Sequence, residues 1–229
     1  INRDINGKKY LCFESGDRLY LSIKNEQVHF ILHSVCTIFA GEIITCDKST
    51  IDMNRKLKIT ELNRISIEEF KEADKLPLVV VLDNIRSLHN IGSVFRTSDA
   101  FRIECIYLCG ITATPPHPEM HKTALGAEFT VDWKYVNNSV EAVDNLKKDG
   151  YTVYSVEQAE GSIMLNELVL DKDKKYAIVM GNEVKGVQQE VIDHSHGCIE
   201  IPQYGTKHSL NVSVTAGIVI WDLFNKLRS

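Results

Sequence analysis

The 229-residue sequence has no Cys-x-x-Cys pair, no excess of basic residues and no apolar run of roughly 18 residues, the length needed to span a membrane. Its six cysteines are dispersed and lie mostly inside apolar segments, so we expect reduced core residues rather than disulfides or zinc ligands. The N-terminus shows no basic region followed by an apolar core and a small-residue cleavage site. These absences predict a cytoplasmic protein without a membrane partner.

The charge balance argues against a protein that binds nucleic acid through a broad basic surface. The chain has 26 basic and 31 acidic residues, a net charge of −5, whereas nucleic-acid-binding domains usually show a basic balance. A local basic patch is still compatible with this sum. If the ligand is RNA, we expect weak non-specific affinity and recognition through shape and local contacts.

The first long apolar strand is not followed by a Gly-x-Gly-x-x-Gly turn but by Asp83-Asn84-Ile85-Arg86-Ser87-Leu88, which disfavours a dinucleotide-binding domain. From residue 78 onward, apolar β-rich runs alternate with helical patterns. This alternation predicts an α/β fold with a parallel sheet covered by helices on both faces. We expect strands at Leu78–Leu82, Glu104–Leu108, Thr152–Val156, Tyr176–Met180 and Cys198–Ile201. We expect helices after Asn90 and at Pro118–Leu125, Val140–Lys148, Gln188–Ile192 and Leu210–Leu227.

Residues 1–52 have a different pattern, with short β-rich segments at Tyr10–Phe13, Arg18–Ile23 and Val28–Leu32. We interpret them as an N-terminal extension that forms a small β-meander. Residues 53–75 are then a helical connector and residues 76–229 the main domain, which fits a chain long enough for one well-buried domain and a small appendage. Because the chain begins with Ile1 and a basic segment starts at Met53, a second hypothesis takes Met53 as the native start.

Two loops near the C-terminus carry the clearest chemical signal. Gly181-Asn182-Glu183-Val184-Lys185-Gly186 follows a buried strand, and its glycines let the backbone approach a ligand closely. The second loop runs from Ile201 to Ser213 and interleaves Ser209 and Asn211 with apolar residues before the last helix, for which Ser209 is the expected N-cap. That helix places Leu210, Val214, Ile218 and Trp221 on one face. Loops at two strand ends can share one crevice.

Together with Asn90-Ile91-Gly92-Ser93-Val94-Phe95-Arg96, these loops resemble the three motifs of the SpoU/TrmH family, the SPOUT-class RNA 2'-O-ribose methyltransferases. The resemblance runs from about residue 76 to 228 and departs from the commonest form at Gln203 and His208. It implies a C-terminal trefoil knot, S-adenosylmethionine as cofactor, an RNA substrate, no metal, and a homodimer that completes each site.

By this resemblance the catalytic residues are Asn90, Arg96, Glu183, Ser209 and Asn211, and the residues that contact S-adenosylmethionine are Gly181, Ile201 and Leu210. The latter three would act largely through backbone groups, which depend on the path of the chain more than on side chains. For Asn90 and Glu183 the alternatives are a helix N-cap and a solvated carboxylate. The functional interpretation has Asn90 orient Arg96 or the ribose, and Glu183 accept backbone N–H bonds or hold a donor of the substrate.

Arg96 follows Asn90 by six residues, so we expect both to project toward one end of the same helix. An isolated arginine is more often a solvated partner in a surface salt bridge. In the context of the three motifs, its guanidinium can stabilise the alkoxide that develops at a ribose 2'-hydroxyl and can hold a neighbouring phosphate. Because guanidinium hardly ever loses a proton in proteins, another group or a water must remove the hydroxyl proton.

Several histidines and tryptophans have simpler explanations. The segment from His117 to His121 lacks the His-Glu-x-x-His order of a zinc site, and Pro118 suits the first turn of a helix. The loop 112–117 is expected to contact RNA or cap the site. The turn 194–196 is expected to be solvated. Trp133 and Trp221 are expected to pack in the core or at an interface, and an exposed Trp133 could stack on a base.

The leading hypothesis is an S-adenosylmethionine-dependent RNA 2'-O-ribose methyltransferase. Segments 156–158 and 201–203 resemble the eukaryotic tRNA-guanosine branch and slightly favour tRNA over rRNA. One alternative is a catalytically silent RNA-binding module of the same fold. Another, motivated by the acidic net charge, is an unrelated α/β enzyme that acts on a small nucleotide.

Overall fold

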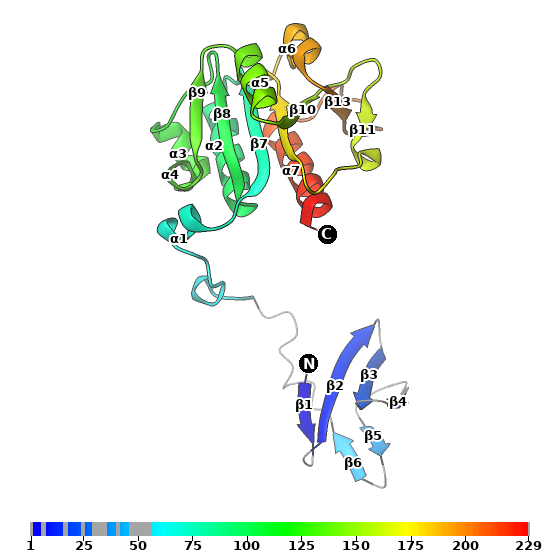
Figure 1. Cartoon of the computed structure of the whole chain (residues 1–229). Helices are drawn as coiled ribbons and strands as arrows, with labels where there is room; N and C mark the ends of the chain where they lie inside the picture. Colours follow the sequence, from blue (N-terminus) through cyan, green and yellow to red (C-terminus); the bar gives the residue numbers. More distant parts are fainter. Residues whose placement is uncertain are drawn as a thin grey trace. The chain divides into compact units, whose positions relative to one another are not determined.

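The computed structural model describes residues 56–228 in full and, of residues 1–55, only the backbone of six strands. The chain divides into two units, Ile1–Asn63 and Arg64–Ser229. In the first unit, strands β1 (Asn2–Ile5), β2 (Lys8–Ser15), β3 (Arg18–Ile23) and β4 (Glu26–Val28) pair antiparallel in chain order. Strands β5 (Cys36–Phe39) and β6 (Glu42–Thr45) form a separate antiparallel pair (Figure 1).

Two of the strands expected in the extension, Tyr10–Phe13 and Arg18–Ile23, therefore lie within β2 and β3. The third was expected at 28–32, but β4 ends at Val28, and residues 29–32 lie outside the described residues. Met53, the hypothetical native start, also lies outside them. The connector is helical only in part, in the 3-10 turn Ile59–Glu61 and in helix α1 (Ile67–Glu72), which a Ser66 capping box begins.

The second unit contains a seven-stranded parallel sheet in the order β11-β13-β10-β12-β7-β8-β9. Its strands are β7 (Leu76–Asp83), β8 (Ile103–Cys109), β9 (Trp133–Val136), β10 (Tyr151–Val156), β11 (Ile163–Met164), β12 (Lys175–Met180) and β13 (Gly197–Glu200). The five expected strands are confirmed. The sequence did not indicate β9 and β11 because both are short strands at the edges of the sheet, where no continuous apolar run is required.

Helices cover both faces of this sheet, as expected (Figure 1). They are α2 (Leu88–Ala100), α3 (Pro118–Ala124), α4 (Ala127–Thr130), α5 (Ser139–Lys148), α6 (Gln189–His194) and α7 (Val212–Arg228). Strand β7 carries apolar side chains on both faces of the sheet, so both faces must be covered. Leu78, Val80 and Leu82 belong to the apolar cluster that includes α2 and α7, whereas Val79 and Val81 belong to the cluster that includes α5 and α6.

Helix α7 differs from the expectation at its start. It begins at Val212, and its N-terminal N–H groups are capped by Asn211, whose Oδ1 accepts hydrogen bonds from the N–H groups of Ser213 (2.9 Å) and Val214 (3.4 Å). Ser209, the expected cap, lies in the preceding loop. Asn211 takes this position because its short side chain can accept from the second and third N–H groups of the helix.

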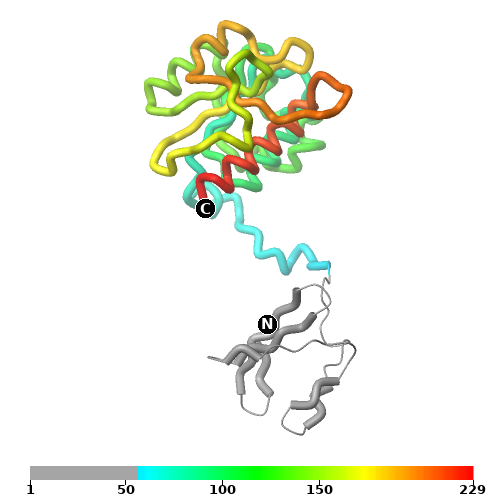
Figure 2. Tube along the Cα trace, turned by 90° about the vertical axis from the view of Figure 1, so that its right-hand side faces the viewer, coloured from blue at the N-terminus to red at the C-terminus, as the bar shows by residue number. Residues whose placement is uncertain are grey.

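The sequence placed Val214, Ile218 and Trp221 on one face of α7, and this face is exposed. Val214 is 51%, Ile218 39% and Trp221 54% exposed, while the opposite face packs on the core. Helix α7 lies beside α2, and Figure 2 shows the path of its backbone. The buried residues of that opposite face are Val212, Ala216, Val219, Ile220 and Leu223. A helix that is apolar on nearly all sides gives no local indication of which face is covered.

Three cysteines with described side chains, Cys105, Cys109 and Cys198, are buried free thiols, as expected. Burial raises the pKa of Cys105 to about 11 and that of Cys109 to about 12, so both remain protonated at neutral pH. The side chains of the other three cysteines lie outside the described residues. Among helices of the described chain, none has the length and apolar character needed to cross a membrane.

Candidate active site

The loops after β7, β10, β12 and β13 lie at one edge of the sheet, because these strands are parallel and adjacent. Ligands of open parallel sheets bind at this carboxyl edge. The loop after β12 begins with Gly181, and the loop after β13 begins with Ile201 and leads into α7. The structure therefore brings two of the three sequence motifs to one edge, and α2, which carries the third, begins after the loop that leaves β7.

Glu183 connects the loop after β12 to the N-terminus of α2. Its carboxylate accepts hydrogen bonds from the backbone N–H groups of Arg86 (3.1 Å) and Ser87 (3.0 Å) and from Nδ2 of Asn90 (3.1 Å). Partial burial opposes ionisation, but these bonds and one from its own N–H outweigh it and hold the pKa of Glu183 below the ordinary value. Glu183 is therefore an ionised, bonded carboxylate and not a freely solvated one.

Asn90 joins Glu183 to the third motif. Its Nδ2 donates to Glu183, and its Oδ1 accepts a hydrogen bond of 3.2 Å from Nδ2 of Asn211. The two bonds fix which way the Asn90 amide points. Asn90 does not cap α2, because the N-cap is Ser87, whose Oγ accepts from the Asn90 N–H at 3.3 Å. We call Asn90, Glu183 and Asn211 the carboxylate–amide cluster.

The loop 181–187 is shaped by its own backbone. Asn182 and Gly186 exchange two backbone hydrogen bonds of 3.0 and 2.9 Å, and the Asn182 side chain donates to the carbonyl of Asn84 at 2.7 Å. A Cβ added at Gly181 would lie 2.2 Å from the carbonyl carbon of Gly186 and 2.2 Å from the nitrogen of Val187. Gly181 is thus required by a close approach within the loop itself, and the backbone angle that disfavours side chains belongs to Gly186, at φ +69°.

The other residues expected at the cofactor lie on the loop after β13. Ile201 is half-buried and packs against the core cluster, whereas Leu210 is 40% exposed and Ser209 is exposed. On the loop after β12, Val184 is also exposed, at 80%. The edge of the sheet thus presents apolar side chains on both loops beside the polar carboxylate–amide cluster.

Arg96 does not join this cluster. It is exposed and lines a shallow groove between α2 and α3 together with Ser93, Thr97, Ala100, Phe101, Lys122 and Thr123. In the described part of the chain, neither a hydrogen bond nor an ion pair connects Arg96 to Asn90, Glu183 or Asn211. The expectation that Asn90 and Arg96 point to one end of the helix is wrong, because six helical positions separate them by about 9 Å and about a third of a turn.

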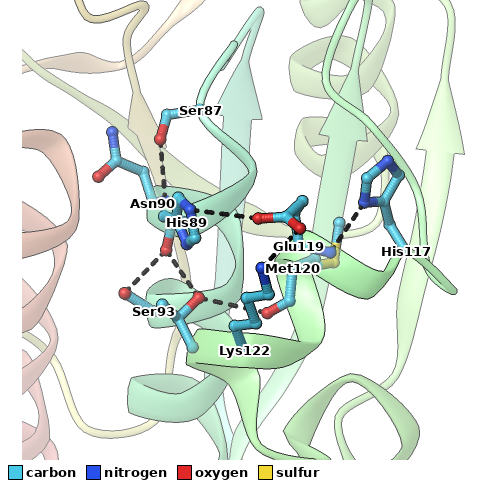
Figure 3. A network of polar contacts seen from close by, with 9 residues as sticks. Ser87, His89, Asn90, Ser93, His117, Glu119, Met120 and Lys122 are labelled. Carbon is cyan, nitrogen blue, oxygen red and sulfur yellow. Dashed lines mark hydrogen bonds and ion pairs between the residues drawn. The ribbon is translucent and has the colours of Figure 1, made fainter.

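The groove is formed because α2 and α3 pack closely at Gly92. A Cβ at Gly92 would lie 2.2 Å from Oγ1 of Thr123 and 2.3 Å from the carbonyl oxygen of Met120. Thr123 Oγ1 donates to the His89 carbonyl across this junction at 3.0 Å. Figure 3 shows a second contact across it, between His89 and Glu119 at 3.7 Å, and the pair that Glu119 forms with Lys122 within α3 at 2.7 Å. The glycine of the first motif therefore serves helix packing, and it places Lys122 in the same groove as Arg96.

Sequence reasoning missed Asp83, a fully buried carboxylate at the end of β7. It accepts hydrogen bonds from Ser139 Oγ (2.6 Å), from Asn84 Nδ2 (2.8 Å) and from both Nε2 (2.8 Å) and the N–H (3.2 Å) of Gln188. It thereby ties the starts of α5 and α6 to the central strand. A carboxylate that directly follows a buried apolar run was the available signal, since such a group must be bonded.

The loop 112–117 has a structural role at both of its ends. Thr112 is buried, donates to the carbonyl of Leu82 (3.1 Å) and accepts from the N–H of Ile85 (2.9 Å). His117 is the N-cap of α3, because its Nδ1 accepts from the N–H of Glu119 at 3.2 Å. Neither the cap nor the buried hydroxyl supports the expectation that these two residues contact RNA.

The turn 194–196 is partly solvated, as expected, and each of its residues is also hydrogen-bonded. His194 pairs with Asp144 at 2.9 Å, Ser195 bonds to Ser155 at 2.8 Å, and His196 accepts from the N–H of Val153 at 3.0 Å. Sequence alone could not supply these partners, which belong to α5 and β10.

The histidines do not assemble a metal site, since within the described residues no three His, Cys, Asp or Glu side chains are grouped to hold a metal ion. Trp133 packs partly against the core, as expected. Trp221 is not in the core: it is 54% exposed on α7 and stacks on Phe224 at 6.0 Å between ring centroids, and its packing at an interface stays a prediction.

Comparison with known proteins assigns this chain to a family. Residues 77–221 match the family described as the SpoU rRNA Methylase family. A relative from Staphylococcus aureus (strain MSSA476), whose name places it in the TrmH family of tRNA/rRNA methyltransferases, is 31% identical over 160 residues. The matched segment covers 70% of this chain and 63% of that relative, so the chain spans less than two thirds of its length.

Solved structures show the same likeness. A TrmH/SpoU tRNA modifying enzyme from A. aeolicus superposes with a TM-score of 0.61 at 27% identity, over 70% of this chain and 81% of the other. An rRNA methyltransferase from Sinorhizobium meliloti, solved with AdoMet bound, superposes with a TM-score of 0.62 at 26% identity, over 70% of this chain and 61% of the other.

Proposed function

Because this chain belongs to the SpoU rRNA Methylase family, we propose that it is an S-adenosylmethionine-dependent RNA methyltransferase that modifies a ribose 2'-hydroxyl. The observation that carries the proposal is the carboxylate–amide cluster. Two hydrogen bonds join one residue from each of the three motifs, Asn90, Glu183 and Asn211, at the edge of the sheet where ligands bind.

The residues at this edge fit S-adenosylmethionine. The loop after β12 turns back on itself through Gly181 and Gly186 and exposes Val184, while the loop after β13 exposes Leu210 beside Asn211. Apolar side chains next to a few fixed polar groups are the usual lining of a cofactor site. We assign Gly181, Ile201 and Leu210 to this cofactor, which supplies a methyl group on a positively charged sulfur.

The cluster has a positioning role in the reaction. Glu183 is ionised and fixes the Asn90 amide, and Asn90 in turn fixes Asn211 at the start of α7. Such a preorganised set of dipoles costs no reorganisation when a substrate hydroxyl is placed against it. Ser209, exposed two residues before Asn211, is the hydroxyl best placed to meet the ribose.

Arg96 supplies the charge that activates the nucleophile. Its guanidinium stabilises the alkoxide as the methyl group moves to the ribose oxygen and the hydroxyl proton passes to a second group or a water. Lys122 lies in the same groove, so an RNA phosphate can be held there by two cations even though the chain is acidic overall. This local patch reconciles an RNA substrate with a net charge of −5.

A homodimer completes the site. Arg96 lies on a different side of α2 from Asn90, and the apolar face of α7 formed by Val214, Ile218 and Trp221 is exposed. An exposed apolar stripe of this kind is typical of a surface that a protein partner covers. We assign this face to a second copy of the chain, which brings its own Arg96 to the carboxylate–amide cluster.

Two further points belong to the proposal. The C-terminal trefoil knot and the cytoplasmic location stay predictions from the resemblance and the sequence. Among RNA substrates tRNA is slightly favoured over rRNA, on the segments 156–158 and 201–203. The earlier alternative of an unrelated small-nucleotide enzyme is not retained, because residues 77–221 match the family.

The direct test is transfer of tritium from labelled S-adenosylmethionine to RNA isolated from cells that lack the gene. We expect incorporation into tRNA, with the label retained on the ribose after nuclease digestion to nucleosides. Label on a base would overturn the 2'-hydroxyl assignment. Tight RNA binding without any incorporation, unchanged by Arg96→Ala, would instead support the alternative of a catalytically silent RNA-binding module.

A further inference from the structure

The loop after β10 contacts both of the loops assigned to the cofactor. Its first residue, Glu157, continues the edge of the sheet, since its N–H donates to the carbonyl of Ile199 on β13 at 3.1 Å. Strand β10 lies between β12 and β13 in the sheet. Side chains at its end are therefore placed between the loop that follows β12 and the loop that follows β13.

Glu157 holds the loop after β12. Its Oε2 accepts a hydrogen bond of 3.0 Å from the N–H of Val187, and its Oε1 accepts one of 2.9 Å from the N–H of Gln158. A Cβ added at Gly186 would lie 2.1 Å from Oε2 of Glu157, and one added at Gly181 would touch Gly186 and Val187. The Glu157 carboxylate therefore packs against Gly186, and Gly186 and Val187 pack against Gly181 at the end of β12.

Gln158 holds the loop after β13. Its Nε2 donates a hydrogen bond of 2.9 Å to the carbonyl of His208, two residues before Leu210. Within the described part of the chain, this is the only hydrogen bond found between residues 202–210 and the rest of the molecule. Tyr204, in the same loop, is 98% exposed, so packing does little to hold the middle of the loop in place.

We propose, on the basis of the methyltransferase function above, that Glu157 and Gln158 are positioning residues for the cofactor and set the affinity for S-adenosylmethionine. We call them the Glu157–Gln158 bridge. They do not belong to the three motifs, and they act through the loops that carry Gly181, Ile201 and Leu210. The bridge prepares these loops before the cofactor arrives, which lowers the ordering cost of binding.

The Glu157–Gln158 bridge has a different role from the carboxylate–amide cluster. Neither Glu157 nor Gln158 bonds to Asn90, Glu183 or Asn211 in the described structure. Changes to the bridge should therefore raise the KM for S-adenosylmethionine while the rate at saturating cofactor stays near that of the wild type. A change in the cluster should lower the saturating rate.

The test compares Gln158→Glu with the wild type by calorimetry of S-adenosylmethionine binding. Glutamate has nearly the same shape as glutamine but cannot donate to the His208 carbonyl when ionised. We expect the dissociation constant to rise about five- to tenfold, the effect of losing one ordinary hydrogen bond. The matched control is Gln189→Glu, because Gln189 is an exposed glutamine whose side chain bonds only to Asp193 on α6.

Gln158→Glu also adds a negative charge, so further variants at this position must separate the effect of charge from the loss of the donor. Gln158→Lys restores a donor of sufficient length, so its affinity should lie closer to the wild type than that of Gln158→Ala. Hydrogen exchange of residues 203–210 in the free protein should be faster in Gln158→Glu and Gln158→Ala, at unchanged thermal stability. If all three Gln158 variants bind S-adenosylmethionine as the wild type does, the bridge does not set the affinity. If the wild type itself binds none, the proposed methyltransferase function fails instead.

Discussion

Asn90 and Asn211 lie 121 residues apart in the sequence, yet Nδ2 of Asn211 donates a hydrogen bond of 3.2 Å to Oδ1 of Asn90. Glu183 binds the other end of the same Asn90 amide at 3.1 Å. The start of α2, the loop after β12 and the cap of α7 are therefore one unit. A disturbance in any of them should reach the other two.

Arg96→Ala should lower the saturating methylation rate by about 10²- to 10³-fold, the usual cost of one preorganised charge contact in a transition state. Binding of S-adenosylmethionine should be nearly unchanged, because Arg96 lies in the α2–α3 groove and not on the cofactor loops. Single-turnover kinetics and calorimetry measure the two effects. Loss of cofactor affinity with a retained maximal rate would show that the role is wrong.

Arg96→Lys refines this test. Lysine keeps the charge but loses the planar fork that binds a phosphate through two bonds. We expect a rate between those of the wild type and the alanine variant. An activity equal to the wild type would reduce the role of Arg96 to that of a point charge.

Gly181→Val should weaken binding of S-adenosylmethionine by distorting the loop after β12. The added side chain meets the backbone of Gly186 and Val187 at 2.2 Å, and backbone cannot move aside as the end of a flexible side chain can. Calorimetry measures the affinity, and circular dichroism with thermal melting shows whether the protein is folded. Gly197→Ala is the control, since a Cβ there meets only the Tyr154 ring, at an ordinary 3.6 Å. A folded Gly181→Val protein with normal affinity would remove Gly181 from the site.

Glu183→Gln should reduce the free energy of unfolding by about 1 kcal/mol. This is less than the roughly 1.5 to 3 kcal/mol usual for hydrogen bonds to a charged group, because Glu183 is exposed enough for solvent to screen it. Glutamine offers one acceptor oxygen where the carboxylate accepts from Arg86, Ser87 and Asn90. Urea titration measures the difference. Activity should fall too, since Asn90 loses its fixed orientation.

The difference in stability between the wild type and Glu183→Gln should depend on pH. The folded-state pKa of Glu183 lies below the ordinary value for glutamate, so its stabilising contribution is present above that ordinary value, about 4.3. It is lost as the pH falls through the lowered folded-state pKa. The stability difference between the wild type and Glu183→Gln should be constant near neutral pH and should shrink below about pH 4. A difference that grew on acidification would contradict the assigned bonds.

Ile218→Lys should convert a dimer to monomers, because it places a charge in the middle of the exposed apolar face of α7. The monomer should stay folded, since Ile218 is not part of the core, and should lose methylation activity if a second Arg96 completes the site. Analytical ultracentrifugation measures the oligomeric state. Val169→Lys, at a position outside α7 that is 88% exposed, is the control. A wild type that sediments as a monomer would refute the dimer.

Local pattern in the sequence was enough for the strands that are buried on both faces. The long apolar run of β7 is typical of a central strand of a covered sheet, and β8 and β12 follow the same rule. Strand β10 instead alternates buried and half-buried residues, and in β13 only the two central residues are buried. The edge strands β9 and β11 were missed because a strand of two to four residues with one partner needs no such run. The motif residues were recognised from their order and spacing, which are also properties of the sequence.

Tertiary structure alone decided which of these residues meet. Asn90 and Arg96 are close in sequence but face different sides of α2, whereas Asn90 and Asn211 are distant in sequence and bonded. Periodicity describes one element at a time, and a hydrogen bond between two elements depends on the order of the strands that position them. The same reason applies to α7: its sequence made nearly every face apolar, and only packing against α2 and the sheet determined that Val219 is buried and Trp221 exposed.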